Sequence, residues 1–178
     1  MMSDRHFQGN GTRLRAPEPE DLVVMVRVEY ETDAAEMSNT TGPYSRFQLK
    51  QYIEQTQNDL FADRQLRLMI ENGNRQVVGI VDLCSFDPLH NRAEVGIMVD
   101  KSCRRQGIGR NALALLEEHC FRYLGIHQLF AYIAVENLPS RRLFAACGYK
   151  ESAVLKEWAH TFGGGDTEVL VVQKLNLS

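Results

Sequence analysis

The sequence predicts an α/β domain with a partly antiparallel sheet, and three observations support this prediction. An apolar stretch over residues 93–99 leads through a basic glycine turn into a helix with one apolar face. Residues 65–86 hold two apolar stretches around an Asn-Gly-Asn hairpin signal at 72–74. No repeat, linker or low-complexity segment divides the chain. We therefore expect a single domain over residues 1–178, with residues 1–11 as a flexible start.

The chain opens with a strand pattern and two helix patterns. Residues 12–15 alternate polar and apolar side chains, as an edge strand does. Pro17 and the acids after it open the first helix, because a helix start lacks amide partners and favours negative charge. Ser45 can cap the second helix. The side chains expected to face inward are Leu22, Val23, Val26 and Tyr30 on the first helix and Phe47, Leu49, Tyr52 and Ile53 on the second.

The second half of the chain alternates strand and helix patterns again. Residues 93–99 are mostly apolar, which predicts a strand buried on both faces. The helix that follows carries an apolar stripe and ends at Gly125. The remaining expected elements are a strand at 128–135, a short helix at 137–147 and two strands at 149–160 and 167–175.

The turn before the long helix carries the clearest chemical signal. It reads Arg104-Arg105-Gln106-Gly107-Ile108-Gly109. The two glycines remove side chains where backbone N–H groups must face outward, and the helix start adds unpaired donors and the positive end of its dipole. Two arginines add formal positive charge. This combination predicts a binding site for a phosphate or pyrophosphate.

Other glycine motifs explain the turn less well. A P-loop needs Gly-x-x-x-x-Gly-Lys followed by Ser or Thr, and the chain has no such run. Residues 107–112 fit the dinucleotide fingerprint G-x-G-x-x-A, with Glu136 as a candidate ribose-binding acid. However, residues 100–106 separate the first glycine from the strand, and too little chain follows for a doubly wound sheet. A tight turn with solvated arginines is the remaining alternative.

Two motifs together resemble the GNAT superfamily of N-acetyltransferases. The turn matches its Q/R-x-x-G-x-G/A sequence, and residues 137–149 match its second signature, Asn-x-x-Ser, an apolar pair and Gly-aromatic. The resemblance covers residues 12–175 and is closest to the branch of spermidine N-acetyltransferases and ribosomal-protein alanine/serine N-acetyltransferases. It implies a mixed, mostly antiparallel twisted sheet of about seven strands with helices on both faces. It also implies acetyl-coenzyme A bound by Ile97, Met98, Val99, Arg104, Arg105, Gln106, Gly107, Ile108, Gly109, Arg110 and Asn137.

Acetyl transfer to an amine needs a base for the amine and a proton for the leaving thiolate. The superfamily commonly uses a tyrosine as the acid at the position of Phe144, which cannot donate a proton. The ribosomal-protein branch implies Ser140 as the group that faces the thiol and Glu157 as the base instead. Each residue has a structural alternative, because Ser140 can bond to its own helix turn and Glu157 can be a surface acid in a strand.

Acidic residues are the candidates for holding the acceptor amine. Asp82 and Glu94 lie in apolar strands, where they either line the acceptor cleft or face solvent. The stretch 18–36 is rich in acids, and the resemblance places it at the acceptor wall, with Glu31 and Asp33 as expected contacts. Such a wall would attract a polyamine or a basic peptide, although a charge run is more often a solvated face.

Composition narrows the class of protein. The chain of 178 residues is 44% hydrophobic and 24% charged, and its net charge of −3 argues against nucleic-acid binding. The four cysteines and five histidines show no ligand spacing, so we expect neither a disulfide framework nor a metal site. No apolar run reaches the length of a membrane span, and the start lacks a signal-peptide pattern.

We therefore predict a cytoplasmic enzyme that transfers acetyl directly from acetyl-coenzyme A to a primary amine, with a polyamine such as spermidine as one candidate acceptor. The alternatives are a protein N-terminal acetyltransferase of the ribosomal-protein type, a coenzyme-A-binding regulator without turnover and a nucleotide-binding oxidoreductase. Neither a membrane nor a nucleic acid is an expected partner. A homodimer or a larger homo-oligomer is compatible with this prediction.

Overall fold

The computed structural model describes residues 7–30, 43–160 and 164–177. Eight strands form one sheet in the order β1-β2-β3-β4-β5-β6-β8-β7. The strands are β1 (Gln8–Gly9), β2 (Thr12–Arg15), β3 (Leu66–Glu71), β4 (Val77–Asp87), β5 (Arg92–Val99), β6 (Gln128–Ala134), β7 (Lys150–His160) and β8 (Asp166–Leu175). The α-helices are α1 (Leu22–Tyr30), α3 (Arg46–Gln55), α4 (Leu60–Asp63), α5 (Ile108–Glu118) and α6 (Leu138–Ala146). A π-helical turn, His119–Tyr123, extends α5 toward Gly125.

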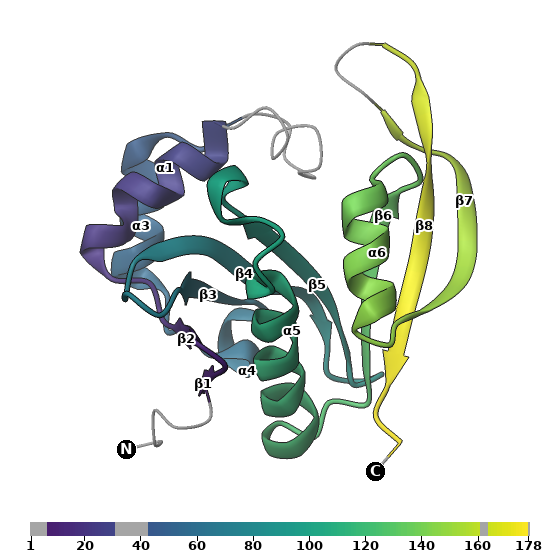
Figure 1. Ribbon diagram of the computed structural model, residues 1–178, viewed down its shortest axis with the longest axis horizontal. Helices are drawn as coiled ribbons and strands as arrows, with labels where there is room; N and C mark the ends of the chain where they lie inside the picture. Colours follow the sequence, from purple (N-terminus) through teal and green to yellow (C-terminus); the bar gives the residue numbers. More distant parts are fainter. Residues whose placement is uncertain (1–6, 31–42, 161–163, 178) are drawn as a thin grey trace.

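Neighbouring residues of the central strands point to opposite faces of the sheet, and each face has its own core. On one face, Met69 and Ile80 pack with Met25 of α1 and Leu49 of α3. On the other face, Val81 belongs to the larger core that contains α5 and α6 (Figure 1). The prediction of a mixed, mostly antiparallel sheet with helices on both faces is therefore confirmed, with one strand more than expected.

The two central strands separate along most of their length. β5 and β6 are the one parallel pair among the described strands, and their ladder joins only residues 92–94 to residues 128–130. Beyond that ladder, residues 95–99 and 131–134 diverge, and Figure 1 shows the sheet opening between its β1–β5 half and its β6–β8–β7 half. We call this opening the split. It leaves one edge of each strand free of strand partners.

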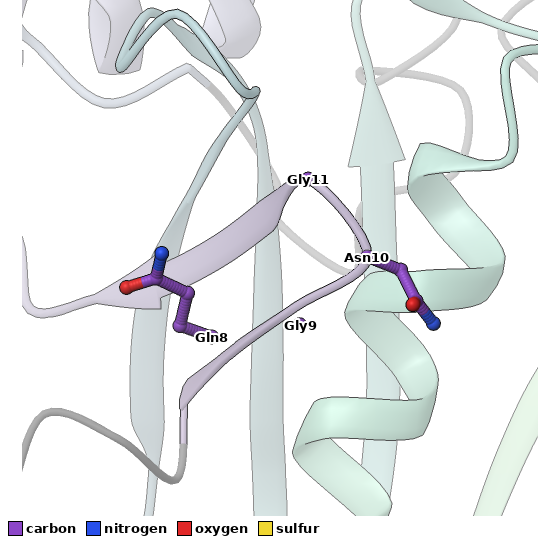
Figure 2. A pocket seen from close by; sticks show the side chains of 4 residues that line it. All are labelled: Gln8, Gly9, Asn10 and Gly11. Carbon is purple, nitrogen blue, oxygen red and sulfur yellow. The ribbon is translucent and has the colours of Figure 1, made fainter.

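The predicted flexible start, residues 1–11, falls partly outside the described residues, since these begin at Phe7. Within it, β1 pairs with β2 through a two-residue turn at Asn10 and Gly11, so residues 8–11 belong to the sheet. Both turn residues have positive φ, 49° and 72°, as the twist of a tight hairpin requires. Figure 2 shows this hairpin beside α5, and Asn111 Nδ2 of that helix donates to the Asn10 carbonyl at 3.1 Å. With β1 outside it, β2 is also not the edge strand.

Three side chains that were expected to face inward point outward. Val23, Tyr30 and Phe47 are 65%, 59% and 67% exposed. The reason is that α1 and α3 share a small core, in which Met25 and Leu49 are the fully buried helix residues. Each of these two helices therefore buries a narrow stripe, not a broad face.

The prediction that residues 93–99 are buried on both faces is also wrong. Ala93 and Val95 are buried in the core beneath α5, but Glu94, Gly96 and Met98, which alternate with them, are only half-buried. The helices on that second face pack on β3 and β4 and stop short of β5. Among the described residues, no helix covers the face of the sheet from β5 to β7, which we call the helix-free face.

A buried ion-pair network joins the N-terminal segment to the sheet. Arg15 Nη1 and Nη2 contact the Asp21 carboxylate at 2.6 and 2.9 Å, and Arg15 Nε contacts Glu71. Asp21 and Glu71 are 3% and 5% exposed. Burial alone would raise the pKa of both carboxyls. The hydrogen bonds and charge of Arg15, helped by the Glu18 amide at Asp21 and by Arg13 at Glu71, more than offset burial, and both pKa values are lowered.

Candidate functional site

The glycine turn ends in a helix start that cannot cap itself. Gly107 is the N-cap of α5, and its φ of +81° lies in the left-handed region that favours glycine. Among the described residues, no side chain accepts from the first-turn amides of Ile108, Gly109 and Arg110. Arg104 Nε donates to the Val99 carbonyl at 2.8 Å, which ties the turn to the end of β5. The turn thus presents a set of backbone donors at one fixed place.

The side chains of the turn divide into two groups. Arg105 and Arg110 are exposed, so their guanidinium groups can meet an anion. Gln106 Nε2 folds back onto the Ser102 carbonyl at 3.2 Å, and the Ile108 side chain is buried in the core. Of these two predicted coenzyme contacts, Gln106 stays exposed, whereas Ile108 can reach a ligand only through its backbone.

Gly109 has a different role from Gly107. A Cβ at Gly109 would lie 3.3 Å from Leu143 Cδ2 of α6 and 3.7 Å from Val99 Cγ2. A Cβ at Gly107 would meet nothing within 4 Å. Gly109 therefore permits the close approach of α5 to α6, whereas Gly107 permits the shape of the turn.

One edge of β5 faces the split. Ile97, Met98 and Val99 pair with β4 along their other edge, and they have no partner on β6. Successive residues of a strand direct their N–H and C=O groups to opposite edges, and the Asp100 amide donates to the Val78 carbonyl of β4. In this register Met98 also directs its backbone groups to β4, whereas Ile97 and Val99 direct theirs to the split. Of the three predicted coenzyme contacts, Ile97 and Val99 therefore line the split through their main chain.

The start of α6 lies after the end of β6, at the mouth of the split. Asn137 is its N-cap, and Asn137 Oδ1 accepts from the Ser140 amide at 3.2 Å. The Ser140 side chain is half-buried. Phe144 is fully buried and packs edge-to-face on Tyr149, with ring centroids 4.9 Å apart. Of these residues, Ser140 alone offers a hydroxyl near the surface of the split.

Glu94 lies at the closed end of the split. It pairs with Cys84 of β4 on one side and with Phe130 of β6 on the other, in the last step of the parallel ladder. Ser85 Oγ donates to Glu94 Oε2 at 3.1 Å, and no cationic side chain among the described residues pairs with this carboxylate. Burial raises the pKa of Glu94, with the Ser85 hydrogen bond opposing it. A half-buried carboxylate of raised pKa is suited to accept a proton.

Asp82, the other predicted anchor, is already paired. Arg67 Nε and Nη2 contact its two oxygens at 2.9 and 2.7 Å, and the guanidinium also lies over the Tyr52 ring at 5.6 Å. A bidentate pair of this kind compensates the carboxylate charge. The structure therefore leaves Glu94, not Asp82, as the uncompensated acid on this face.

Glu157 lies far across the sheet from Glu94. It is an exposed residue of β7, with φ of +50° in an irregular stretch between Leu155 and Ala159. β8 and β6 lie between β7 and β5, so the backbones of β7 and β5 are roughly 15 Å apart by strand spacing. Glu31 and Asp33 lie outside the described residues, so their predicted substrate contacts stay predictions, as does the role of Glu157.

A hollow opens beside Glu94 on the helix-free face. Its volume is about 320 Å³, and Ser85, Asp87, Arg92, Gln128, Phe130, Tyr132, Val171 and Gln173 line it. The sequence carried a partial signal, because Phe130 and Tyr132 alternate in a strand and so share one face. A similar hollow of about 350 Å³ follows the backbone of residues 8–11, where Figure 2 shows Gln8 and Asn10 pointing to opposite sides.

The described cysteines do not form a nucleophilic or metal-binding group. All four are free thiols, and burial raises the pKa of Cys84 to about 12, which keeps it protonated at neutral pH. Within the described ranges, no cluster of three or more His, Cys, Asp or Glu could hold a metal ion. No described helix is long and apolar enough to cross a membrane.

Comparison with known families agrees with this geometry. Residues 12–150 match the model of the acetyltransferase (GNAT) domain, which is more than half of the chain. The chain belongs to this family. The match includes both motifs on which the resemblance was based, the turn at residues 104–109 and the second signature at residues 137–149, so both are parts of one domain.

Individual relatives are more distant. The spermidine N(1)-acetyltransferase of Vibrio cholerae is 26% identical over 116 residues, 65% of each chain, so the match spans slightly less than two thirds of that protein. A structure of spermidine N-acetyltransferase from the same organism, in complex with CoA and spermine, superposes with a TM-score of 0.83 at 22% identity, covering 94% of this chain and 97% of that one. A dodecameric form gives a TM-score of 0.79 at 23% identity, covering 94% and 95%. Ribosomal-protein-S5-alanine acetyltransferase from Vibrio fischeri gives 0.83 at 17% identity, covering 97% of both chains.

Changing Gly107 to alanine should weaken coenzyme A binding about tenfold, the equivalent of one lost hydrogen bond to a charged group. A Cβ at a φ of +81° strains the backbone, and relaxing it turns the amide donors away from the anion. Gly125→Ala is the matched control, because Gly125 also has positive φ (+64°) and open space around it, but it lies at the other end of the helix. Titration calorimetry with coenzyme A should separate the two variants. Equal affinities would place the coenzyme elsewhere.

Proposed function

We propose that this protein is an acetyl-coenzyme-A-dependent N-acetyltransferase that acts on primary amines. One observation carries the proposal. The start of α5, opened by Gly107, lies at the mouth of the split between β5 and β6, and Glu94, a carboxylate without a described cationic partner, lies at the closed end of the same split. The helix start suits a pyrophosphate, and the split leads from it toward Glu94. Phosphate binding and proton acceptance therefore lie at the two ends of one path.

Each group along this path has a chemical task. Glu94 accepts a proton from the acceptor ammonium, directly or through one water molecule, which frees the nitrogen lone pair for attack. The main-chain donors of β5 that face the split can polarise the thioester carbonyl. The Ser140 hydroxyl can donate a hydrogen bond to the departing thiolate, in place of the phenol that Phe144 lacks. Acetyl passes directly to the amine, since no described thiol is poised to carry it.

A polyamine is one candidate acceptor within this proposal. Its support is the likeness to the spermidine N-acetyltransferases of Vibrio cholerae and the acidic stretch 18–36, of which residues 31–36 lie outside the described residues. The dodecameric form of that relative likewise supports a homo-oligomer of this chain as a candidate assembly. At the closed end of the split, Glu94 is the one described carboxylate without a cationic partner, which suits a single ammonium group there. Glu136, just after β6 at the mouth of the split, accepts from Thr167 Oγ1 at 2.7 Å and also has no cationic partner among the described residues.

The decisive experiment combines binding with turnover. Purified protein is titrated with coenzyme A, then assayed for thiol release from acetyl-coenzyme A with spermidine, a peptide N-terminus and single small amines. Thiol release that depends on the amine, with the acetylated amine found by mass spectrometry, is the expected result. Tight coenzyme binding without an acetylated product from any amine would support the alternative of a regulator, which the loss of the usual tyrosine at Phe144 favours.

The acid limb of the pH–rate profile tests the role of Glu94. A carboxylate must be ionised to accept a proton, so kcat/KM should fall as pH drops through the raised pKa of Glu94. Ser85→Ala removes a hydrogen bond that favours the ionised form, and the limb should therefore move to higher pH. Ser152→Ala, which alters an exposed hydroxyl on β7, should leave the limb in place. Identical profiles for all three proteins would exclude Glu94 as the titrating base.

A further inference from the structure

The residues that line the hollow next to Glu94 indicate which kind of ligand group it can bind. Its volume of about 320 Å³ is at the lower end of ligand pockets, roughly 300–1,000 Å³, so it can hold one side chain or a small ring. Ser85 lines the hollow and also donates to Glu94, so the two sites share a wall. An amine held at Glu94 would therefore place its substituent in the hollow.

The charges of the hollow are balanced without a ligand. Arg92 Nη2 lies 3.3 Å from Asp87 Oδ2, and the amides of Leu89 and His90 donate to Asp87 Oδ1 at 3.0 and 3.1 Å. Within the described part of the chain, no other charged side chain lines it. A second ammonium group would lose water of hydration there without gaining a free carboxylate. The hollow therefore suits an uncharged group.

The floor of the hollow is aromatic. Phe130 and Tyr132 meet edge-to-face with centroids 5.6 Å apart, and Tyr132 stacks on Trp158 of β7 at 6.3 Å. Val171 of β8 lies between these strands and completes the apolar surface. An aromatic or branched apolar group would bury area against these rings.

One polar pair completes the lining. Gln173 Nε2 donates to Gln128 Oε1 at 3.0 Å, which fixes the orientation of both amides. Gln128 keeps its NH₂ donors, and Gln173 keeps its carbonyl acceptor. A carboxamide or peptide group on the ligand offers the matching acceptor and donor.

We infer that the acceptor is an α-amino amide or peptide N-terminus with an aromatic or branched apolar side chain, and that this side chain occupies the hollow. The inference rests on the proposed function for the reaction itself, but the hollow can bind such a ligand whether or not acetyl transfer follows. The balanced charge of the hollow opposes a polyamine in this position, as does the presence beside it of one described carboxylate, Glu94, without a cationic partner.

Binding is measured separately from turnover. Trp158 is the single tryptophan of the chain and is 60% exposed at the edge of the aromatic floor, so its fluorescence reports on the hollow. Phenylalaninamide should change this fluorescence saturably, whereas glycinamide should not over the same range. Val171→Phe fills the hollow and Phe130→Ala removes its floor, and each should weaken phenylalaninamide binding by roughly tenfold or more. Tyr123→Ala, an exposed aromatic on the π-helical turn, is the control and should bind as the wild type does.

Turnover is then compared for phenylalaninamide, glycinamide and spermidine. We expect kcat/KM for phenylalaninamide to exceed that for glycinamide by roughly tenfold to a hundredfold, the value of one buried aromatic side chain, and Val171→Phe to abolish that preference. Saturable binding without turnover would leave the hollow assigned and overturn the proposed reaction. Failure of phenylalaninamide to bind, or a higher kcat/KM for spermidine, would overturn the inference while leaving the acetyltransferase proposal intact.

Discussion

Replacing Arg15 by methionine should lower the free energy of unfolding by about 3–5 kcal/mol, the cost of leaving a buried carboxylate without its cation. Asp21 would lose its bidentate partner, and Glu71 would lose its contact with Nε. Urea unfolding at pH 7, followed by circular dichroism, measures the change. Arg122→Met is the control, because the Arg122–Glu118 pair is exposed and should contribute no more than about 0.5 kcal/mol.

The pH dependence of this effect has a definite sign. The pKa values of Asp21 and Glu71 are lowered in the folded protein, so the stability they contribute is present above their unfolded values of 3.8 and 4.5 and is lost as pH falls through the folded values. In the Arg15→Met protein the same carboxyls are buried without that cation, and protonation relieves them. The difference between the two proteins should therefore shrink between pH 5 and pH 3, roughly the range of carboxyl titration. A constant difference would show that Arg15 acts through packing alone.

Changing Glu94 to glutamine should lower turnover by roughly a hundredfold, because a general base typically contributes that much or more. The amide keeps the shape of the side chain and can still bond to Ser85, so coenzyme A affinity should not change. Steady-state kinetics on the preferred amine, with calorimetry for the coenzyme, separates these two effects.

Glu157→Gln is the matched comparison, since the sequence resemblance assigned the base to Glu157. Its exposure on β7, with two strands between it and β5, leads us to expect a turnover within about threefold of the wild type, as for a surface substitution away from the chemistry. If Glu157→Gln lowers turnover strongly and Glu94→Gln does not, the general base is Glu157 on β7, and the proposed role of Glu94 is wrong.

Local patterns in the sequence were sufficient to find the turn. Two glycines, basic neighbours and a helical stripe are all encoded within a short segment, and Gly107 and the start of α5 lie where these predict. The Asn10-Gly11 hairpin was equally local, but its signal lies near the chain start, where flexibility is the usual expectation.

The properties of the site depended on pairings that no local pattern contains. Asp82 and Glu94 looked alike as acids in apolar strands, and only the register of β3 with β4 shows that Arg67 compensates one of them. The aromatic floor likewise requires Tyr132 and Trp158 to meet across an intervening strand, β8, that is last in the chain. Strand order is a global property, so the hollow could not be predicted.

The split gives this sheet two edges in its interior. An exposed edge elsewhere would invite pairing with another chain and so aggregation. Here the ladder at residues 92–94 closes one end, and α5 and α6 approach each other through Gly109 and Leu143 beside the other. The two free edges face each other inside the sheet, so they are not presented to other chains as an outer edge strand is. An extended group that contains amides can pair with the free edges of β5 and β6 as a further strand would. The arm of coenzyme A that carries the thiol contains such amides.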